Sequence, residues 1–388
     1  MNRKKSILLL YPDMPSQTKA AGHKSAFRMI EELYLLEHHI HLVTFASTNI
    51  VESDRIRLGK ICKSIDILTI STKQKFINCL LNPLFPALIA SRISGEFIKI
   101  LNFLLPQCDI IHIEFSQMLY YVWYIKMKYP DKKVYFYSHD IIAQKLYREV
   151  RSTYFLHPLK LWDYLLTLWR EKQLMKYADG IIVFNTKDRN LLQDTEKMIS
   201  VIPLYTDVTI NNFINSDSQR YSIAFFGAMN RKENYLAAIE FIEKCWPVIH
   251  ATYPWLELQI IGGNPHASLM TFSGNQNIYV TGFVENPYEL IANAWVMVAP
   301  ITLGAGLKVK VLESLMCGCP VIAFPAGAEG IDMEYEEGLI TVADYASMAE
   351  EIISIVSGMN KYDTSRIKKL VNEKFNWQES VQFLKENY

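Results

Sequence analysis

The chain has 388 residues, of which 50% are hydrophobic, 21% charged and 12% aromatic, and this balance excludes disordered, collagen-like and coiled-coil proteins. At about 150 residues per domain, the length predicts two domains, each large enough to bury its own core. The net charge is zero, but residues 1–200 carry 28 basic and 19 acidic side chains, whereas residues 201–388 carry 12 and 21. The basic half could face anionic lipid or an anionic substrate. The sequence contains no Lys/Arg run interleaved with aromatics, so it gives no indication of nucleic-acid binding.

Short apolar runs alternate with longer helical patterns in the first half, which indicates a parallel α/β domain. The runs are continuous rather than alternating, as in strands that are buried on both faces. Strands are expected at Ser6–Tyr11, Ile40–Phe45, Ile110–Ile113, Val134–Tyr137 and Gly180–Phe184. Helices are expected at Ser25–Glu37, at Leu161–Tyr177 and from Asp188–Leu192 onward.

A polar stretch, residues 204–220, is expected to link this domain (1–203) to a second one (221–370). Its strands are expected at Ser222–Phe226, Leu256–Ile261, Ile278–Thr281, Val296–Ala299 and Pro320–Phe324. Its helices are expected at Leu236–Ile249, Glu289–Ala294, Lys308–Cys317 and Tyr345–Ser357, and the tail reads as helical at Arg366–Phe375 and Gln378–Tyr388. The pattern predicts two doubly wound domains with a cleft between them and ligands at the C-terminal ends of the strands.

The six cysteines and the apolar segments predict a cytoplasmic protein. The cysteines are scattered without a C-x-x-C pair, as is typical of thiols in a reducing compartment. The first apolar run lasts only five residues before Pro12 and Asp13, which is shorter than the core of a signal peptide. The apolar stretch 76–105 is interrupted by prolines and charges, so it lacks the roughly 20 apolar residues of a membrane-spanning helix.

The stretch Gly304-Ala-Gly306-Leu-Lys308-Val-Lys310-Val-Leu-Glu313 follows an expected strand and opens a helix. Glycines let backbone N–H groups approach a ligand, and the helix N-terminus adds about half a positive charge. Two lysines in this first turn are unfavourable for a bare helix, and a diphosphate would remove the conflict. Lys310 and Glu313 share a face, so they would offer an ammonium to phosphate and a carboxylate to ribose. The alternative is a solvated Lys310–Glu313 pair.

This segment, continued by Gly327-Ala-Glu-Gly330, resembles the nucleotide-sugar motif of group 1 glycosyltransferases, which are retaining enzymes of the GT-B fold. The resemblance covers nearly the whole chain and is strongest over 280–330. Further segments that match in order and spacing are Pro15–Arg28 with Gly22, Tyr177–Phe184, Phe226–Met229 with Asn234, Val280–Val284 and Phe375–Trp377. The resemblance implies two Rossmann-like domains, of which the first binds the acceptor and the second the donor. It also implies a terminal helix, 371–388, that crosses back to the first domain.

The implied reaction moves a sugar from a nucleotide diphosphate sugar to an acceptor hydroxyl in cell-surface polysaccharide or glycolipid synthesis. No D-x-D occurs, so neither a metal ion nor a cofactor is expected, and the nucleotide sugar serves as co-substrate. The implied donor-binding residues are Gly227, Gly304, Gly306, Lys308, Lys310 and Glu313. In the first domain, His139 is the implied catalytic residue, and Gly22, Lys24 and Glu114 are expected in the acceptor or sugar pocket. His139 beside Asp140 also fits a structural pair, and Lys24 a solvated charge.

One departure from the family pattern leaves two other functions open. Members often carry two glutamates with seven residues between them; Glu313 matches the second, but Ala305 stands at the first. A nucleotide-sugar epimerase of the same fold is one alternative, and a catalytically inactive nucleotide-sugar-binding protein is the other.

The segment 73–105 combines apolar side chains with lysines and arginine, as interfacial helices do. Together with the basic first half, it predicts peripheral contact with the inner membrane face. The alternative is that 73–105 packs as ordinary helices of the acceptor domain, and the tryptophans are interpreted as core or surface aromatics.

Overall fold

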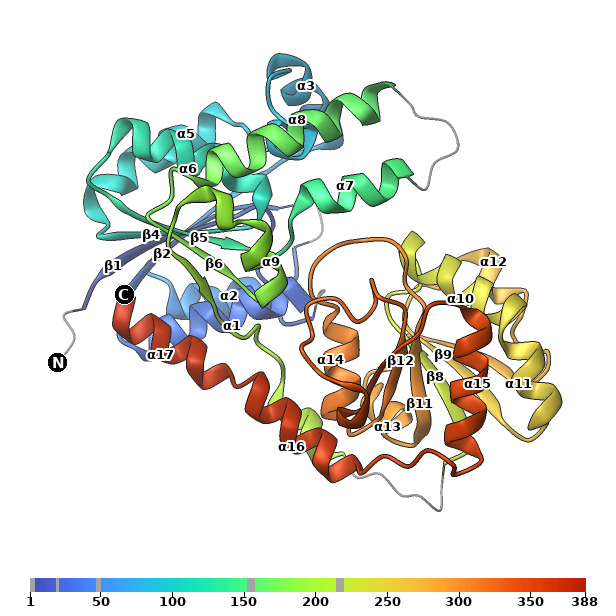
Figure 1. Ribbon diagram of the computed structural model, residues 1–388. Coiled ribbons are helices and arrows are strands. Elements are labelled where there is room, and N and C mark those ends of the chain that lie inside the picture. Colours follow the sequence, from blue (N-terminus) through green and yellow to red (C-terminus); the bar gives the residue numbers. More distant parts are fainter. Residues whose placement is uncertain (1–3, 19–20, 47–49, 152–157, 214–219) are drawn as a thin grey trace. The chain divides into compact units, whose positions relative to one another are not determined.

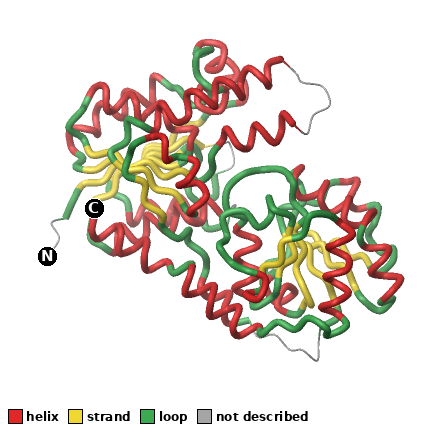
Figure 2. The backbone as a smooth tube through the Cα atoms, in the orientation of Figure 1, coloured by secondary structure: helices red, strands yellow, loops and turns green. Residues whose placement is uncertain are grey.

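The computed structural model describes residues 4–18, 21–46, 50–151, 158–213 and 220–388. The chain divides into two compact units, which Figure 1 shows coloured along the sequence. Unit 1 comprises the chain up to Tyr205 together with Trp377–Tyr388, and unit 2 comprises Thr206–Asn376. Each unit has one parallel sheet with helices around it (Figure 2). The expected pair of doubly wound α/β domains is therefore confirmed.

Unit 1 is built on a seven-stranded parallel sheet in the order β3-β2-β1-β4-β5-β6-β7. The inner strand β1 pairs with β2 and β4. Its residues Ile7–Tyr11 are fully buried because helices cover both faces of the sheet. The strands are β1 (Ser6–Tyr11), β2 (His39–Ala46), β3 (Ser64–Thr69), β4 (Ile110–Glu114), β5 (Lys133–Ser138), β6 (Gly180–Val183) and β7 (Ile199–Val201). The order reverses between β1 and β4, and ligands of open α/β sheets bind at such a switch point.

The helices of unit 1 include the end of the chain. They are α1 (Ala21–Leu35), α2 (Glu52–Ile61), α3 (Thr72–Leu81), α4 (Ala87–Ala90), α5 (Gly95–Leu104), α6 (Leu119–Lys128), α7 (Ile142–Arg151), α8 (Pro158–Met175), α9 (Thr186–Leu191) and α17 (Trp377–Asn387). In α17, buried Ser380 donates a hydrogen bond to the carbonyl of Pro203 (2.7 Å), and the Trp377 indole N–H lies 3.4 Å from a carboxylate oxygen of Glu32. The expected return of the terminal helix to the first domain is confirmed, and this helix begins at Trp377.

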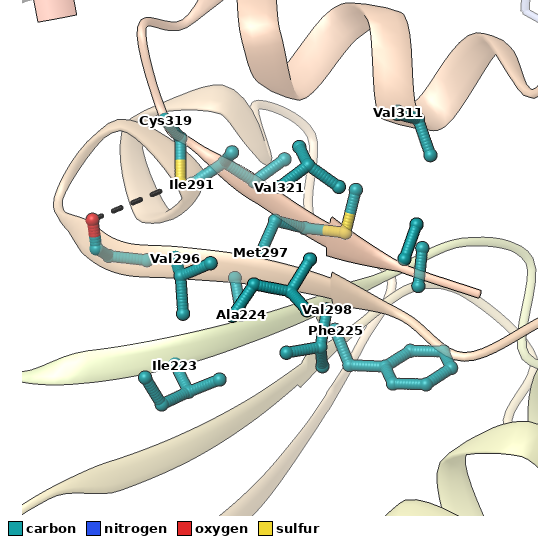
Figure 3. Packing of buried hydrophobic residues seen from close by; sticks show 14 of the residues in the cluster. Ile223, Ala224, Phe225, Ile291, Val296, Met297, Val298, Val311, Cys319 and Val321 are labelled. Atoms are coloured by element: carbon teal, nitrogen blue, oxygen red, sulfur yellow. Dashed lines mark hydrogen bonds between the residues drawn. The ribbon is translucent and has the colours of Figure 1, made fainter. Parts of the chain in front are cut away.

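Unit 2 has a six-stranded parallel sheet in the order β10-β9-β8-β11-β12-β13. Figure 3 shows its core, where side chains of β8 and β11 pack with Val311 of the overlying helix. The strands are β8 (Ser222–Phe226), β9 (Glu257–Ile261), β10 (Ile278–Gly282), β11 (Ala294–Ala299), β12 (Val321–Ala323) and β13 (Leu339–Thr341). The helices are α10 (Lys232–Lys244), α11 (Trp246–Thr252), α12 (Ala267–Met270), α13 (Tyr288–Ala292), α14 (Val309–Met316), α15 (Tyr345–Val356) and α16 (Thr364–Lys374).

Some elements differ from those expected. The single helix expected over Leu236–Ile249 is two helices, because Pro247 stands in the first turn of α11, where its missing N–H is tolerated. The segment expected to be a linker, 204–220, contains a 3-10 helix, η4 (Val208–Asn212), whose Ile210 is fully buried in the core of unit 2. Residues 214–219 lie outside the described part of the chain. The outer strands β3, β7 and β13 were not expected from the sequence, and β7 and β13 have only three residues each, too few for a recognisable pattern.

The apolar segment 73–105 forms three helices with different surroundings. In α5, Phe97 and Leu101 are fully buried in the core of unit 1, so this part packs as ordinary helix. In α3, Phe76 and Leu80 are exposed. No helix in the described ranges is long and apolar enough to cross a membrane.

Candidate active site

In unit 2, the ends of β8 and β9 approach each other through two glycines. The Gly227 N–H donates to the carbonyl of Ile261 (3.1 Å). A Cβ on Gly262 would lie 1.7 Å from the carbonyl oxygen of Gly227, so no side chain fits there. A Cβ on Gly227 would lie 3.3 Å from Nζ of Lys310. The sequence-predicted residues Gly227 and Lys310, which are 83 positions apart, therefore lie side by side.

Lys310 reaches from the first turn of α14 to α10. Its Nζ donates to Oδ1 of Asn234 (2.6 Å), whose Nδ2 donates to the carbonyl of Ala228 (2.9 Å). Burial, with the positive charge of Lys308, lowers the pKa of Lys310 to about 7. The hydrogen-bond partner of this desolvated ammonium is a neutral amide, and the charge of Glu233 offsets the lowering only in part, so an anionic ligand would stabilise the charged form.

The glycine loop before α14 has the backbone that its sequence requires. Gly304 and Gly306 have φ values of 88° and 70°, a left-handed region that other residues enter at a cost. The loop curls so that the Lys308 ammonium donates to the carbonyls of Ala305 (2.9 Å) and Gly306 (2.8 Å). In the described part of the chain no side chain caps α14, so the first N–H groups of this helix form a positive end that suits an anion.

Glu313 lies one turn further along α14 and is held by a residue that the sequence analysis missed. The Tyr288 hydroxyl donates to Oε1 of Glu313 (3.1 Å). Burial, reinforced by the charge of Glu313, raises the pKa of Tyr288, so the phenol keeps its proton and remains a donor. The only sequence signal for Tyr288 was its place shortly after the Val280–Val284 motif.

Unit 1 contains a buried carboxylate cluster centred on Glu114, at the end of β4. Its Oε1 accepts from the Tyr11 hydroxyl (3.0 Å) and lies 2.8 Å from Nε2 of His112, and its Oε2 lies 2.7 Å from Nε2 of His139. Burial raises the pKa of Glu114, but the hydrogen bonds and charges of His112 and His139 outweigh it and bring this pKa to about 2. Glu114 is therefore ionised, and the ring nitrogen of each histidine that faces it carries a proton.

His139 is held between this carboxylate and aromatic rings. Its ring stacks on Phe115 with centroids 3.8 Å apart and planes within 7°. A Cβ on Gly22 would lie 3.2 Å from Phe115 and 3.7 Å from Nδ1 of His139. Because Nε2 donates to Glu114, Nδ1 is the acceptor in a neutral ring. The structure thus brings three sequence-predicted residues, Gly22, Glu114 and His139, into one cluster.

Lys24 is not part of this cluster. It lies in the first turns of α1, half-buried, and no hydrogen bond or ion pair joins it to another residue in the described ranges. Its assignment to an acceptor pocket stays a prediction.

The cluster extends to the last residue of the chain, which the sequence analysis also missed. Nδ1 of His112 lies 2.7 Å from the hydroxyl of Tyr388, and that hydroxyl lies 3.3 Å from the hydroxyl of Tyr137. His112 also stacks on Tyr137, with centroids 4.0 Å apart. A continuous series of contacts therefore runs from Tyr388 through His112 and Glu114 to His139.

Comparisons with known proteins relate part of this chain to a family. Residues 220–358 match the model of the family "Glycosyl transferases group 1". The chain is 19% identical over 367 residues, 92% of each protein, to an uncharacterized 44.6 kDa protein in the cps region of Klebsiella pneumoniae.

Two solved structures share the architecture of the whole chain. Sucrose-phosphate synthase from Thermosynechococcus elongatus has a TM-score of 0.72 at 16% identity, over 99% of this chain and 98% of that one. HepE from Anabaena in complex with UDP-glucose has a TM-score of 0.68 at 15% identity, over 98% of each chain. At such identities the structures establish the fold alone, and the segment that matches the family model holds the glycine loop, Lys310 and Glu313. The chain therefore has the GT-B fold, and residues 220–358 of its second unit match the glycosyl transferases group 1 family.

Proposed function

We propose that the protein is a retaining glycosyltransferase that moves a hexose or related sugar from a UDP-linked donor to an acceptor hydroxyl in cell-surface polysaccharide or glycolipid synthesis. The observation that carries the proposal is Lys310, a desolvated ammonium beside two glycine turns and an uncapped helix N-terminus. The preference for uridine is supported by HepE, which was solved with UDP-glucose. The cps-region relative supports a polysaccharide or glycolipid acceptor. The cytoplasmic location expected from the sequence stays a prediction.

In this proposal the diphosphate lies at the N-terminus of α14, within reach of Lys310. Negative charge develops on the leaving diphosphate as the glycosidic bond lengthens. Preorganised N–H groups and an ammonium stabilise that charge, and one such donor is typically worth about 3 to 4 kcal/mol. Lys308 contributes mainly by holding the loop through the Ala305 and Gly306 carbonyls. Because these groups belong to the protein, the proposed reaction needs no metal ion, and activity in EDTA tests this directly.

Two carboxylates have different roles in the proposal. Glu313, held by Tyr288, binds the ribose hydroxyls. Glu114 does not touch substrate; it keeps the proton of His139 on Nε2, so that Nδ1 is available to accept a hydrogen bond from a sugar hydroxyl. Retention of configuration is carried over from the group 1 family that residues 220–358 match, with attack and departure on the same face of the sugar.

Calorimetric titration with UDP, GDP and uridine tests the donor assignment. Lys310→Met should weaken UDP binding about ten- to a hundredfold, since a charge-assisted hydrogen bond is worth roughly 1.5 to 3 kcal/mol, and should leave uridine binding unchanged. The control is Lys369→Met, in which a lysine with 75% of its side chain exposed is removed from α16. Failure of the wild type to bind UDP, or equal losses for UDP and uridine, would contradict the assignment.

Product analysis after incubation with UDP-glucose separates the remaining alternatives. A transferase without acceptor should slowly release glucose and UDP. An epimerised nucleotide sugar would identify an epimerase instead, and binding without any turnover, even with acceptor, would identify the inactive binding protein that Ala305 leaves open.

A further inference from the structure

One face of unit 1 carries large apolar side chains that the fold leaves in solvent. They come from α3, from the turn after it and from α8, and we call them the α3–α8 surface. Its members, which are between 49% and 64% exposed, are Phe76, Leu80, Leu84, Trp162, Leu165 and Trp169.

The two parts of this surface are held together within unit 1. The Arg170 guanidinium of α8 donates to the carbonyl of Leu84 (3.1 Å) and lies 5.4 Å from the ring centroid of Phe85. The Ala87 N–H donates to a carboxylate oxygen of Asp163 in α8 (2.7 Å). Figure 1 shows α3 next to α8 on the same side of the sheet. The exposed side chains therefore form one surface rather than two isolated patches.

The exposed residues follow helical periodicity, yet they do not serve the core. Trp162, Leu165 and Trp169 recur at three- and four-residue spacing along one face of α8. The core-facing side of the same helix is formed by other residues, among them buried Glu171 and Leu174. Since α8 is already packed through that side, the second apolar stripe is not needed for folding. A contiguous exposed patch of this kind marks an interaction site.

The charges around the surface are mostly positive. The segments 71–92 and 158–175 contain two acidic residues, Asp163 and Glu171. Glu171 is buried, and Asp163 accepts the Ala87 N–H. The same segments contain six cations, of which Arg92 is half-buried and donates to the Pro12 carbonyl, and Lys172 pairs with Asp194 (3.2 Å). The remaining four are Lys73, Lys75, Lys160 and Arg170.

We propose that the α3–α8 surface docks on an anionic lipid bilayer. Tryptophan and leucine would enter the headgroup region, where amphipathic indole rings are favoured, and the surrounding cations would face the lipid phosphates. Charge complementarity selects this occupant, because lysines around an apolar stripe are attracted to an anionic leaflet and are unfavourable in the dry centre of a protein interface.

Vesicle sedimentation tests the proposal without any nucleotide sugar, so its outcome is independent of the proposed function. The probe is a vesicle of about three parts phosphatidylcholine to one part phosphatidylglycerol, compared with phosphatidylcholine alone. The wild type should bind the anionic vesicle at low salt and be released as salt screens the charges. The double variant Phe76→Ser, Trp162→Ser should bind about a hundredfold more weakly, since burial of each large apolar side chain is worth about tenfold.

The matched control is Trp255→Ser, which removes a tryptophan that is 52% exposed in unit 2 and should leave vesicle binding unchanged. Circular dichroism and urea denaturation of the double variant show whether unit 1 is still folded. The proposal is overturned if the wild type ignores anionic vesicles at low salt or if the double variant binds as the wild type does. Self-association that the double variant abolishes, without vesicle binding, would show that the surface binds a second copy of the chain instead.

Discussion

Glu114→Gln is the most informative single substitution in unit 1, because it keeps the shape of a buried hub and removes its charge. The pKa of Glu114 falls from 4.5 to about 2 in the folded chain, a difference equivalent to about 3 kcal/mol of stability. Because the folded pKa lies below the unfolded one, this stability is present above pH 4.5 and is lost as the pH falls toward 2. The variant should therefore lose about 3 kcal/mol at pH 7, and its difference from wild type should narrow as the pH falls below about 5.

Urea denaturation between pH 3 and pH 8 measures this difference, with the free energy of unfolding determined for both proteins at each pH. Glu373→Gln is the control, since this carboxylate is 58% exposed and lies 3.9 Å from Lys369; it should behave as wild type. A difference between Glu114→Gln and wild type that stays constant or widens toward pH 3 would refute the ionised hub. The assignment of the histidine protons would then fail with it.

Three further predictions use other features of the fold. Burial raises the pKa of Glu171 to about 7, so its contribution to stability is present below the unfolded pKa and is lost as the pH rises through 7. Glu171→Gln should therefore reduce the pH dependence of the thermal denaturation midpoint between pH 5 and 9. A pH dependence equal to that of the wild type would contradict this. Gly274→Ala should lower the free energy of unfolding by roughly 1 to 2 kcal/mol, the cost of left-handed strain. Gly262→Ala should lower it far more, because a Cβ at Gly262 meets backbone whereas one at Gly274 meets nothing within 4 Å. Equal losses in urea denaturation would contradict the close approach of the backbone at Gly262. Tyr388→Phe leaves a buried His112 nitrogen unpaired and should lower the free energy of unfolding by about 1 to 3 kcal/mol. Unchanged stability in the same assay would contradict the hydrogen bond between Tyr388 and His112.

Much of the secondary structure follows from local sequence. The strand Ser6–Tyr11 and the strand Ser222–Phe226 were expected with the bounds that the structure has, because a continuous apolar run of this length is typical of a strand that is buried on both faces. The glycine loop before α14 was recognisable for a similar reason, since Gly304 and Gly306 occupy backbone conformations that few other residues adopt. Such signals depend only on a residue and its near neighbours in the chain.

The partners of the candidate site residues depended on tertiary structure. Glu114, His139 and Gly22 come from three segments that meet because β4 lies between β1 and β5. Lys310 likewise contacts Asn234 only because β8 and β11 are neighbours in the second sheet. Tyr388 joins the Glu114 cluster because the chain returns to unit 1 at its end.

Which apolar side chains remain exposed also depended on tertiary structure. The helices α3 and α5 are both apolar in sequence, yet Phe97 of α5 is fully buried and Phe76 of α3 is exposed. Helical periodicity states which residues share a face, but which face finds a neighbour depends on strand order and on helices packed from elsewhere in the chain. Burial, hydrogen-bond partners and pKa values arise from those long-range contacts, so they emerge only when the whole unit has folded.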